Sequence, residues 1–220
     1  MVSVILLMAG RGKRMGYERN KVLLPFGDKY LFEFPLKVFL EKGYQVICVI
    51  SKDDKDIVVP KLPLKNVKYI YGGETRQESV MHGLEVAVGD YVMIHDAARM
   101  WIDDDLLDTI MEESKGIYPV LTYFPVKDTI KVKKAGSLKT LERSELIAAS
   151  TPQCAPLSLF KEVYQLAQEK NYTATDDISL IEKFHPELEI KLVRSKDESF
   201  KVTTPLDYEL AKTIWRNKLL

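Results

Sequence analysis

The chain has 220 residues, in which 32 lysines and arginines are balanced by 32 aspartates and glutamates. This length fits one domain with a large buried core. Because the formal net charge is zero, the protein has no overall field to attract nucleic acid or a membrane surface. We therefore expect neither of them among its partners, and any anion site must be local.

The two cysteines, Cys48 and Cys154, belong to no C-x-x-C motif and to no Cys/His cluster. Isolated cysteines are typical of reduced thiols in a cytoplasmic protein, which we expect here, and they argue against a structural zinc. The apolar run at the N-terminus is too short for a signal peptide or a membrane span, and charged residues follow it at once.

That apolar run, residues 2–7, predicts a buried strand, and a loop containing Gly10 and Gly12 follows it. Glycines let backbone N–H groups approach a ligand closely, and such amide clusters bind anions. Four cations stand in or just after the loop, namely Arg11, Lys13, Arg14 and Lys21. The stretch therefore indicates a triphosphate site, with a plain glycine turn and solvated lysines as the alternative.

The loop differs from the two commonest phosphate-binding motifs. Walker A requires G-x-x-x-x-G-K-[ST], and the Rossmann fingerprint requires G-x-G-x-x-G. Here Met15 and only then Gly16 come after Gly12, and no GK[ST] occurs in the chain. The spacing G-x-G-x-R-M-G followed by lysine resembles the signature of sugar-type nucleotidyltransferases, which join the α-phosphate of a nucleoside triphosphate to a phosphorylated small molecule.

The next segments alternate between helical and extended patterns. We expect a helix over 31–40, a strand over 44–51, an irregular helix over 52–65 and a strand over 67–71. A strand, a helix and a further strand predict a right-handed parallel crossover and hence an α/β layer fold.

A pair of glycines, Gly72 and Gly73, precedes a predicted helix whose capping box is formed by Thr75 and Glu78. We expect Val80, Leu84 and Val88 to form the buried stripe of this helix. The glycines then lie at the carboxyl edge of the sheet, where ligands bind in open α/β folds. Arg76 opposes the dipole of the helix in its first turn, which suggests another reason for its presence.

A strand predicted over 90–94 leads to Asp96, our best candidate for a metal ligand. A carboxylate at this edge is suited to a magnesium ion that bridges phosphate oxygens. We expect the neighbouring His95 to be packed and hydrogen-bonded, and not to act as a base. Residues 103–105 are typical acids of a helix N-terminus.

A strand over 117–124 is followed, over 126–141, by alternating apolar and polar residues around a glycine turn, which predicts a hairpin. Such a ribbon is poorly stable alone, so we expect it to pack on a second subunit. Beyond it we expect a helix over 157–167, a threonine-capped helix after Thr173–Asp177, a strand over 189–193 and a final helix from Thr204.

Seven stretches in this order, from residue 4 to about residue 212, resemble the 2-C-methyl-D-erythritol 4-phosphate cytidylyltransferase family. They are AGRGKRMG with Lys21, GGETRQESV, HDAAR, PVKDTIK, ERSELIAASTPQ, TDD and FKVTTPLD. The resemblance implies a three-layer, Rossmann-like α/β fold with a mostly parallel sheet and a protruding β-hairpin arm. It also implies a single domain over 1–220, in which 126–150 form an arm for dimerisation and substrate binding.

The resemblance further implies a reaction in which CTP and a polyol phosphate give a CDP-alcohol and pyrophosphate, with Mg²⁺ as cofactor and a homodimer as the assembly. The implied catalytic residues are Arg14, Lys21 and Lys201. The implied nucleotide site consists of Ala9, Gly10, Gly12, Gly73, Glu74, Arg76, Ser79 and Asp96, of which Asp96 also serves the metal. The implied acceptor residues are Arg99, Arg143, Thr151 and Thr175, with Arg143 and Thr151 delivered through the arm of the neighbouring subunit.

The chain departs from the family pattern at four places: Met8, Asn20, where proline is usual before the lysine, Met100, and Glu198 with Ser199. Three alternative functions stay open on the sequence. One is the same chemistry on ribitol 5-phosphate, another is a non-catalytic nucleotide-binding relative, and the third, which GGETRQESV and TPQ disfavour, is a sugar-1-phosphate nucleotidyltransferase. Methylerythritol 4-phosphate is the acceptor that HDAAR favours.

Overall fold

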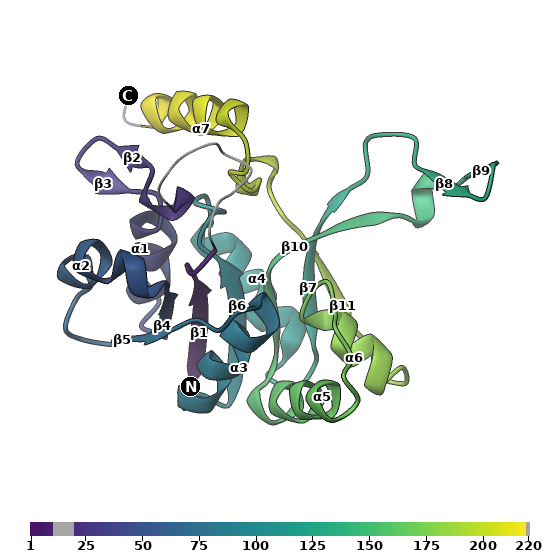
Figure 1. Ribbon diagram of the computed structural model, residues 1–220, viewed down its shortest axis with the longest axis horizontal. Helices are drawn as coiled ribbons and strands as arrows, with labels where there is room; N and C mark the ends of the chain where they lie inside the picture. Colours follow the sequence, from purple (N-terminus) through teal and green to yellow (C-terminus); the bar gives the residue numbers. More distant parts are fainter. Residues whose placement is uncertain (11–19, 219–220) are drawn as a thin grey trace.

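A seven-stranded sheet runs through the middle of the protein, as a computed structural model shows for residues 1–10 and 20–218 (Figure 1). Its strands lie in the order β11-β7-β10-β6-β1-β4-β5. Along the chain they are β1 (Val2–Leu7), β4 (Gln45–Ile50), β5 (Val67–Tyr71), β6 (Tyr91–Asp96), β7 (Val120–Pro125), β10 (Ile147–Pro156) and β11 (Lys191–Arg194). Strand β10 is antiparallel to both of its neighbours, whereas the other pairings are parallel.

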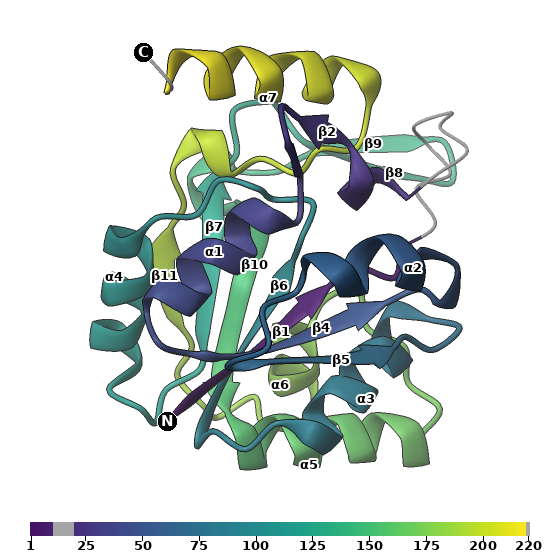
Figure 2. The same ribbon diagram turned by 90° about the vertical axis from the view of Figure 1, so that its left-hand side faces the viewer.

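Helices cover both faces of this sheet (Figure 2). One face carries α1 (Glu33–Glu41), α2 (Lys55–Val58) and α4 (Asp104–Ser114), and the other carries α3 (Arg76–Val86), α5 (Leu157–Glu169) and α6 (Ile178–Phe184). The three-layer α/β fold with a mostly parallel sheet is therefore confirmed.

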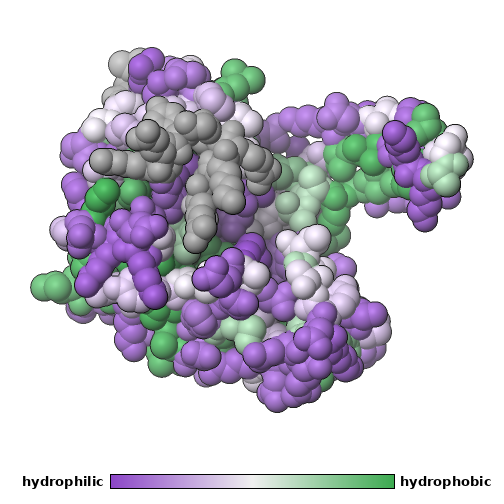
Figure 3. Space-filling view, viewed as in Figure 1, coloured by the Kyte–Doolittle hydropathy of each residue, from purple (hydrophilic) through white to green (hydrophobic). Residues whose placement is uncertain are grey.

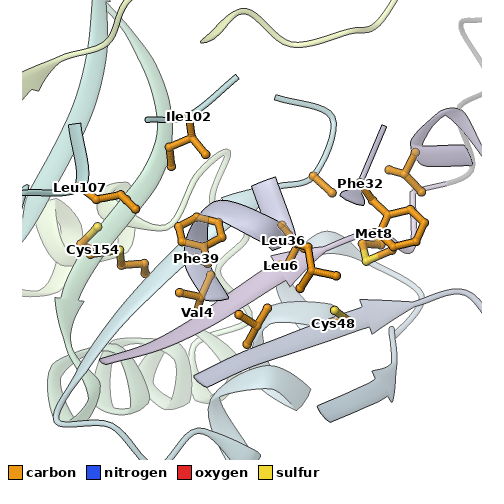
Figure 4. Packing of buried hydrophobic residues seen from close by; sticks show 14 of the residues in the cluster. Val4, Leu6, Met8, Phe32, Leu36, Phe39, Cys48, Ile102, Leu107 and Cys154 are labelled. Atoms are coloured by element: carbon orange, nitrogen blue, oxygen red, sulfur yellow. The ribbon is translucent and has the colours of Figure 1, made fainter. Parts of the chain in front are cut away.

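The alternation of side chains along each strand divides the core into two layers. Val4 and Leu6 of β1 pack with Leu36 and Phe39 of α1 (Figure 4). Ile5, between them, packs on the opposite face with α3 and α5 residues. There, a Cβ added to Gly83 would lie 2.7 Å from the Ile5 side chain, so a residue without a Cβ lets α3 approach β1 closely.

A third, smaller cluster forms where the last helix, α7 (Pro205–Asn217), crosses the top of the molecule (Figure 1). Helix α7 packs there on a short hairpin of β2 (Pro25–Phe26) and β3 (Lys29–Tyr30), which the sequence analysis missed. Phe26 makes edge contacts with Tyr208 and Trp215 of α7. Met100, one of the departures from the family pattern, is buried in the same cluster and fills part of it.

Most other predicted elements are confirmed within a few residues, but two details are wrong. Val88 lies beyond the end of α3 and is 56% exposed, so it does not extend the buried stripe of Val80 and Leu84. No threonine caps α6; instead, the side chain of Asp176 accepts a hydrogen bond from the backbone N–H of Ser179.

The chain between β7 and β10 forms an arm that protrudes from the body (Figure 1). It contains the hairpin β8 (Lys131–Lys134) and β9 (Ser137–Thr140), in which all but one residue is exposed. Hydrophobic residues gather along the arm (Figure 3), and Ile130 and Leu138 remain 39% and 69% exposed. Within the described residues, no helix is both long and apolar enough to cross a membrane.

Candidate active site

A cleft of about 710 Å³ opens at the carboxyl edge of β1, β4, β5 and β6. The predicted site residues that line it are Ala9, Gly10, Lys21, Gly73, Glu74, Arg76, Ser79, Asp96 and Lys201. Gly12 and Arg14 lie outside the described residues. Parallel strands bring their carboxyl ends to one edge, which explains why residues so far apart in sequence share one cleft.

Two glycines shape the wall where β5 meets α3. A Cβ on Gly72 would lie 2.6 Å from the Cβ of Ala9, and a Cβ on Gly73 would lie 2.4 Å from that of Glu78. The backbone N–H of Gly73 donates to the Ser79 hydroxyl at 3.1 Å, and this hydroxyl donates to the Thr75 carbonyl. Ser79 therefore holds the glycine turn in place, and the missing Cβ atoms let Ala9 and Glu78 pack closely against it.

Asp96 ends β6 at the base of the cleft between two cations. The Lys201 ammonium donates to its Oδ2 at 2.6 Å, and the Arg76 Nε lies 3.6 Å from its Oδ1. Burial alone would raise the pKa of Asp96, but attraction by Lys201 and Arg76 outweighs it and holds this pKa well below its usual range. Asp96 is therefore ionised at neutral pH, and its charge is balanced within the cleft.

Arg76 is held by a partner that the sequence analysis missed. Its two terminal nitrogens donate to the two carboxylate oxygens of Asp177 at 2.8 and 2.7 Å, and the Tyr164 hydroxyl also donates to Asp177. Asp177 is fully buried. The bidentate geometry leaves the Nε of Arg76 facing Asp96, which supplies the reason for an arginine at the start of α3. The only sequence signal for Asp177 was its position in the TDD motif, which helix capping explained equally well.

Buried hydrogen bonds fix His95 and Thr151 next to Asp96. His95 Nε2 lies 3.0 Å from the Arg99 carbonyl, so it carries the proton, and Nδ1 accepts from the Thr151 hydroxyl at 3.1 Å. The same hydroxyl accepts from the Asp96 backbone N–H at 3.2 Å. Burial lowers the pKa of His95 to about 4, with a small opposing effect of the Arg99 hydrogen bond. The histidine is neutral and fully engaged, as expected for a packed side chain.

Thr151 lies on β10, inside the main sheet and not on the protruding part of the arm, and is only 5% exposed. It contacts His95 and the backbone of Asp96 in its own chain, behind the lining of the cleft. Its predicted service to a neighbouring subunit stays a prediction. Of the predicted pair, only Arg143 lies on the arm, where its guanidinium donates to the Lys127 carbonyl.

All four predicted acceptor residues, Arg99, Arg143, Thr151 and Thr175, are absent from the lining of the cleft. Arg99 lies just behind Asp96, where its guanidinium donates to the Ser199 carbonyl and faces the Phe124 ring. Its buried Nε has no hydrogen-bond partner within the described chain. Thr175 is exposed on the loop before α6, and Arg143 is exposed on the arm. The cleft of one chain therefore gathers those predicted nucleotide residues that the structure describes, and none of the predicted acceptor residues.

Among the polar residues that line the cleft, Asn20, Ser51, Lys52, Asp53 and Thr203 had no predicted role. Ser51–Asp53 belong to a hydrophilic stretch, and nothing in the local sequence shows that this stretch turns toward Ala9 and Gly10.

The polar residues of the cleft suit a metal ion that is bound jointly by the protein and by the phosphates of a substrate. Among the described residues, no group of three or more histidine, cysteine or acidic side chains is placed to hold a metal ion. Mg²⁺, however, is commonly bound by one or two carboxylates together with substrate phosphates. Asp96 offers one ionised carboxylate in the cleft, which fits this mode and not a preformed protein cage.

Comparisons with known proteins agree with this geometry. A family model described as IspD, 2-C-methyl-D-erythritol 4-phosphate cytidylyltransferase, matches residues 2–217. A protein of that name from Clostridioides difficile is 34% identical over 223 residues, covering 97% of this chain and 93% of the relative. One from Bacillus cytotoxicus is also 34% identical and covers 97% of each chain.

Solved structures give the same result. The 4-diphosphocytidyl-2C-methyl-D-erythritol synthase from Anaerococcus prevotii superposes with a TM-score of 0.87 at 26% identity, covering 98% of each chain. The 2-C-methyl-D-erythritol 4-phosphate cytidylyltransferase from Thermus thermophilus gives 0.78 at 26% identity, covering 96% of this chain and 98% of that one. The fold, the cleft and these matches together show that the chain belongs to the 2-C-methyl-D-erythritol 4-phosphate cytidylyltransferase family.

Proposed function

We propose that this protein is a cytidylyltransferase that transfers CMP from CTP to 2-C-methyl-D-erythritol 4-phosphate, giving the CDP-alcohol and pyrophosphate in the non-mevalonate route to isoprenoids. The observation that carries the proposal is the convergence of Lys21, Asp96 and Lys201 with the glycine turn at Gly73 in one cleft. Membership of the family supplies the identity of the two substrates.

The reaction requires charge balance more than proton transfer. The acceptor phosphate is already an anion near neutral pH, so it attacks the α-phosphorus without a strong general base. His95 is buried, neutral and bonded through both nitrogens, which excludes it from that role. Lys21 and Lys201 offset the repulsion between the two substrates and stabilise the charge that develops as pyrophosphate leaves.

Asp96 would hold the magnesium ion. When bound, Mg²⁺ supplies positive charge to the phosphate oxygens and neutralises the leaving pyrophosphate. Lys201 contacts only the Oδ2 of this carboxylate, at 2.6 Å, and would remain close to phosphates bound beside it.

The acceptor site is completed in a homodimer. Arg99 and Thr151 beside Asp96 and Thr175 on the loop before α6 form the part that one chain supplies. Arg143 of the partner subunit supplies the rest from the arm over 126–150, whose exposed apolar residues require a surface to cover them. The cytoplasmic location inferred from the isolated cysteines stays a prediction.

Pyrophosphate release tests the proposal directly. The purified protein is given CTP and Mg²⁺ with either 2-C-methyl-D-erythritol 4-phosphate or ribitol 5-phosphate. We expect release with the first acceptor and at least about tenfold less with the second, because a pocket discriminates the acceptor by its own contacts. Faster release with ribitol 5-phosphate would assign the rival acceptor, and release with neither would leave a non-catalytic nucleotide-binding relative.

A further inference from the structure

A buried amide and a buried carboxylate connect the walls of the cleft. Asn20 and Asp54 are each only 8% exposed. The Asn20 Nδ2 donates to the backbone carbonyl of Met8 and, at 2.8 Å, to the Asp54 carboxylate. Its Oδ1 accepts from the Val22 backbone N–H at 3.3 Å. Both donors and the acceptor of this side chain are thereby used inside the protein.

The three segments that meet at Asn20 are three parts of the cleft wall. Met8 leads directly into Ala9 and Gly10, Asn20 precedes Lys21, and Asp54 ends the turn that contains Ser51 to Asp53. The residues beside each contact line the cleft. A change in the Asn20 hydrogen bonds would therefore displace the glycine loop, Lys21 and the turn after β4 together.

We propose that Asn20 and Asp54 are positioning residues that fix Lys21 and the Ala9–Gly10 backbone for binding of CTP. The inference rests on the proposed function, and it assigns neither residue a contact with the reacting atoms. Asn20 has φ −58° and ψ 131°, a backbone conformation that the ring of a proline would fix covalently. Here three side-chain hydrogen bonds fix it instead.

The position of the Asp54 carboxylate depends on the hydrogen bond that it accepts from Asn20. Burial raises the pKa of Asp54, and the hydrogen bond from Asn20 opposes that shift by favouring the ionised form. A buried carboxylate whose donor is removed is left unsatisfied and turns toward other donors or water. The amide therefore keeps Asp54 in place beneath the cleft, and Asp54 in turn orients the amide toward Met8.

Removal of the amide tests the proposal. We expect Asn20→Ala to raise the Kd for CTP with Mg²⁺, measured by calorimetry, about tenfold, as loss of a buried hydrogen-bond partner predicts. The KM for CTP should rise with it, whereas the KM for the polyol phosphate should change less than about twofold. Asp54→Asn keeps an acceptor for the Asn20 amide and should leave the Kd for CTP within about threefold of the wild-type value.

Ser3→Ala is the matched control, because the Ser3 hydroxyl of β1 donates a part-buried hydrogen bond to Gln45 of β4, at the ends of these strands that lie away from the cleft. It should lower thermal stability but leave the Kd for CTP unchanged. If Asn20→Ala does not fold, Asp54→Leu removes the acceptor while replacing a buried charge by an apolar group of similar size, and the same rise in Kd is expected.

The possible failures give different results. Wild-type protein that does not bind CTP would refute the proposed function and this inference together. Wild-type binding that Asn20→Ala leaves intact, or an equal rise in both KM values, would refute the positioning role alone. A similar loss of CTP affinity in Ser3→Ala would show that general destabilisation is the cause.

Discussion

The cleft and the arm differ in how far their charged side chains are buried and in how they are paired. At the cleft, Asp96 has a side chain that is 13% exposed, and Asp177 is fully buried behind Arg76; each is neutralised by an arginine or a lysine of the same chain. On the arm, Lys127 and Arg143 are exposed, and the ion pair of Lys127 with Asp197 faces water. The charges at the cleft are thus paired within one chain, whereas those on the arm are exposed to solvent.

This difference implies that substitutions in the two regions should lower activity in different subunits of a dimer. A change in the cleft should act on the subunit that carries it. A change on the arm should act on its neighbour. The four predictions below test that contrast, beginning with the largest effect.

The largest effect is expected from the two lysines of the cleft. Lys21→Ala and Lys201→Ala should each lower turnover by about 10² or more, because each removes a preorganised charge that stabilises the transition state. Steady-state pyrophosphate release measures this loss. Lys191→Ala, which removes a surface lysine paired with Glu189, is the control and should retain turnover. Near-wild-type rates in both cleft variants would exclude these lysines from the chemistry.

A smaller loss, about tenfold or more in kcat/KM for the polyol phosphate, is expected from Arg143→Ala on the arm. If the arm acts on the partner, mixing this variant with Lys201→Ala and allowing subunit exchange restores one intact site in each mixed dimer. Activity should then recover to about a quarter of the wild-type value, as random pairing of a two-fold dimer predicts. Mixtures no more active than the separate variants would place Arg143 in the site of its own chain.

Asp177→Asn tests whether the cleft depends on charges paired within the chain. It leaves the guanidinium of Arg76 without its bidentate carboxylate, so the free energy of unfolding should fall by about 3 kcal/mol. Denaturant titration measures the change. Asp108→Asn removes an exposed partner of Lys42 and should cost less than about 0.5 kcal/mol. Equal effects of the two substitutions would contradict the contrast between buried and exposed pairs.

The smallest effect concerns pH and His95. Its pKa is lowered to about 4 by burial, so the unfolded chain takes up a proton that the folded protein does not. This contribution to stability is complete above the unfolded pKa of about 6.5 and is lost as the pH falls toward about 4. Without added divalent ions, the loss between about pH 7 and about pH 5 should be about 2 kcal/mol.

His95→Gln should remove that part of the pH dependence. His185 provides the comparison, because Glu187 and Glu162 raise its pKa at the surface, and its contribution is present below the unfolded pKa and lost as the pH rises. Stability curves of the His95 and His185 variants that shift in the same direction would contradict this assignment.

The sequence by itself determined the elements whose signals are local. The buried run of β1, the capping box of Thr75 with Glu78 and the cap of α7 at Thr204 depend on neighbours within a few residues, and the structure has each of them. The placement of Asp96 at the same edge as Gly10 also followed, because the carboxyl ends of parallel strands lie together, whereas Lys21 and Lys201 were assigned their roles in the site by the family resemblance.

Only the tertiary structure decided which partners these residues meet. Arg76 pairs with Asp177, which lies 101 positions away, and the Thr151 hydroxyl accepts a hydrogen bond from the backbone of Asp96, 55 positions away. The β2–β3 hairpin is too short to give a pattern and exists because α7 packs on it. Caps and periodicity act over one or two turns of chain, whereas burial and charge pairing depend on groups that become neighbours only after the layers have packed.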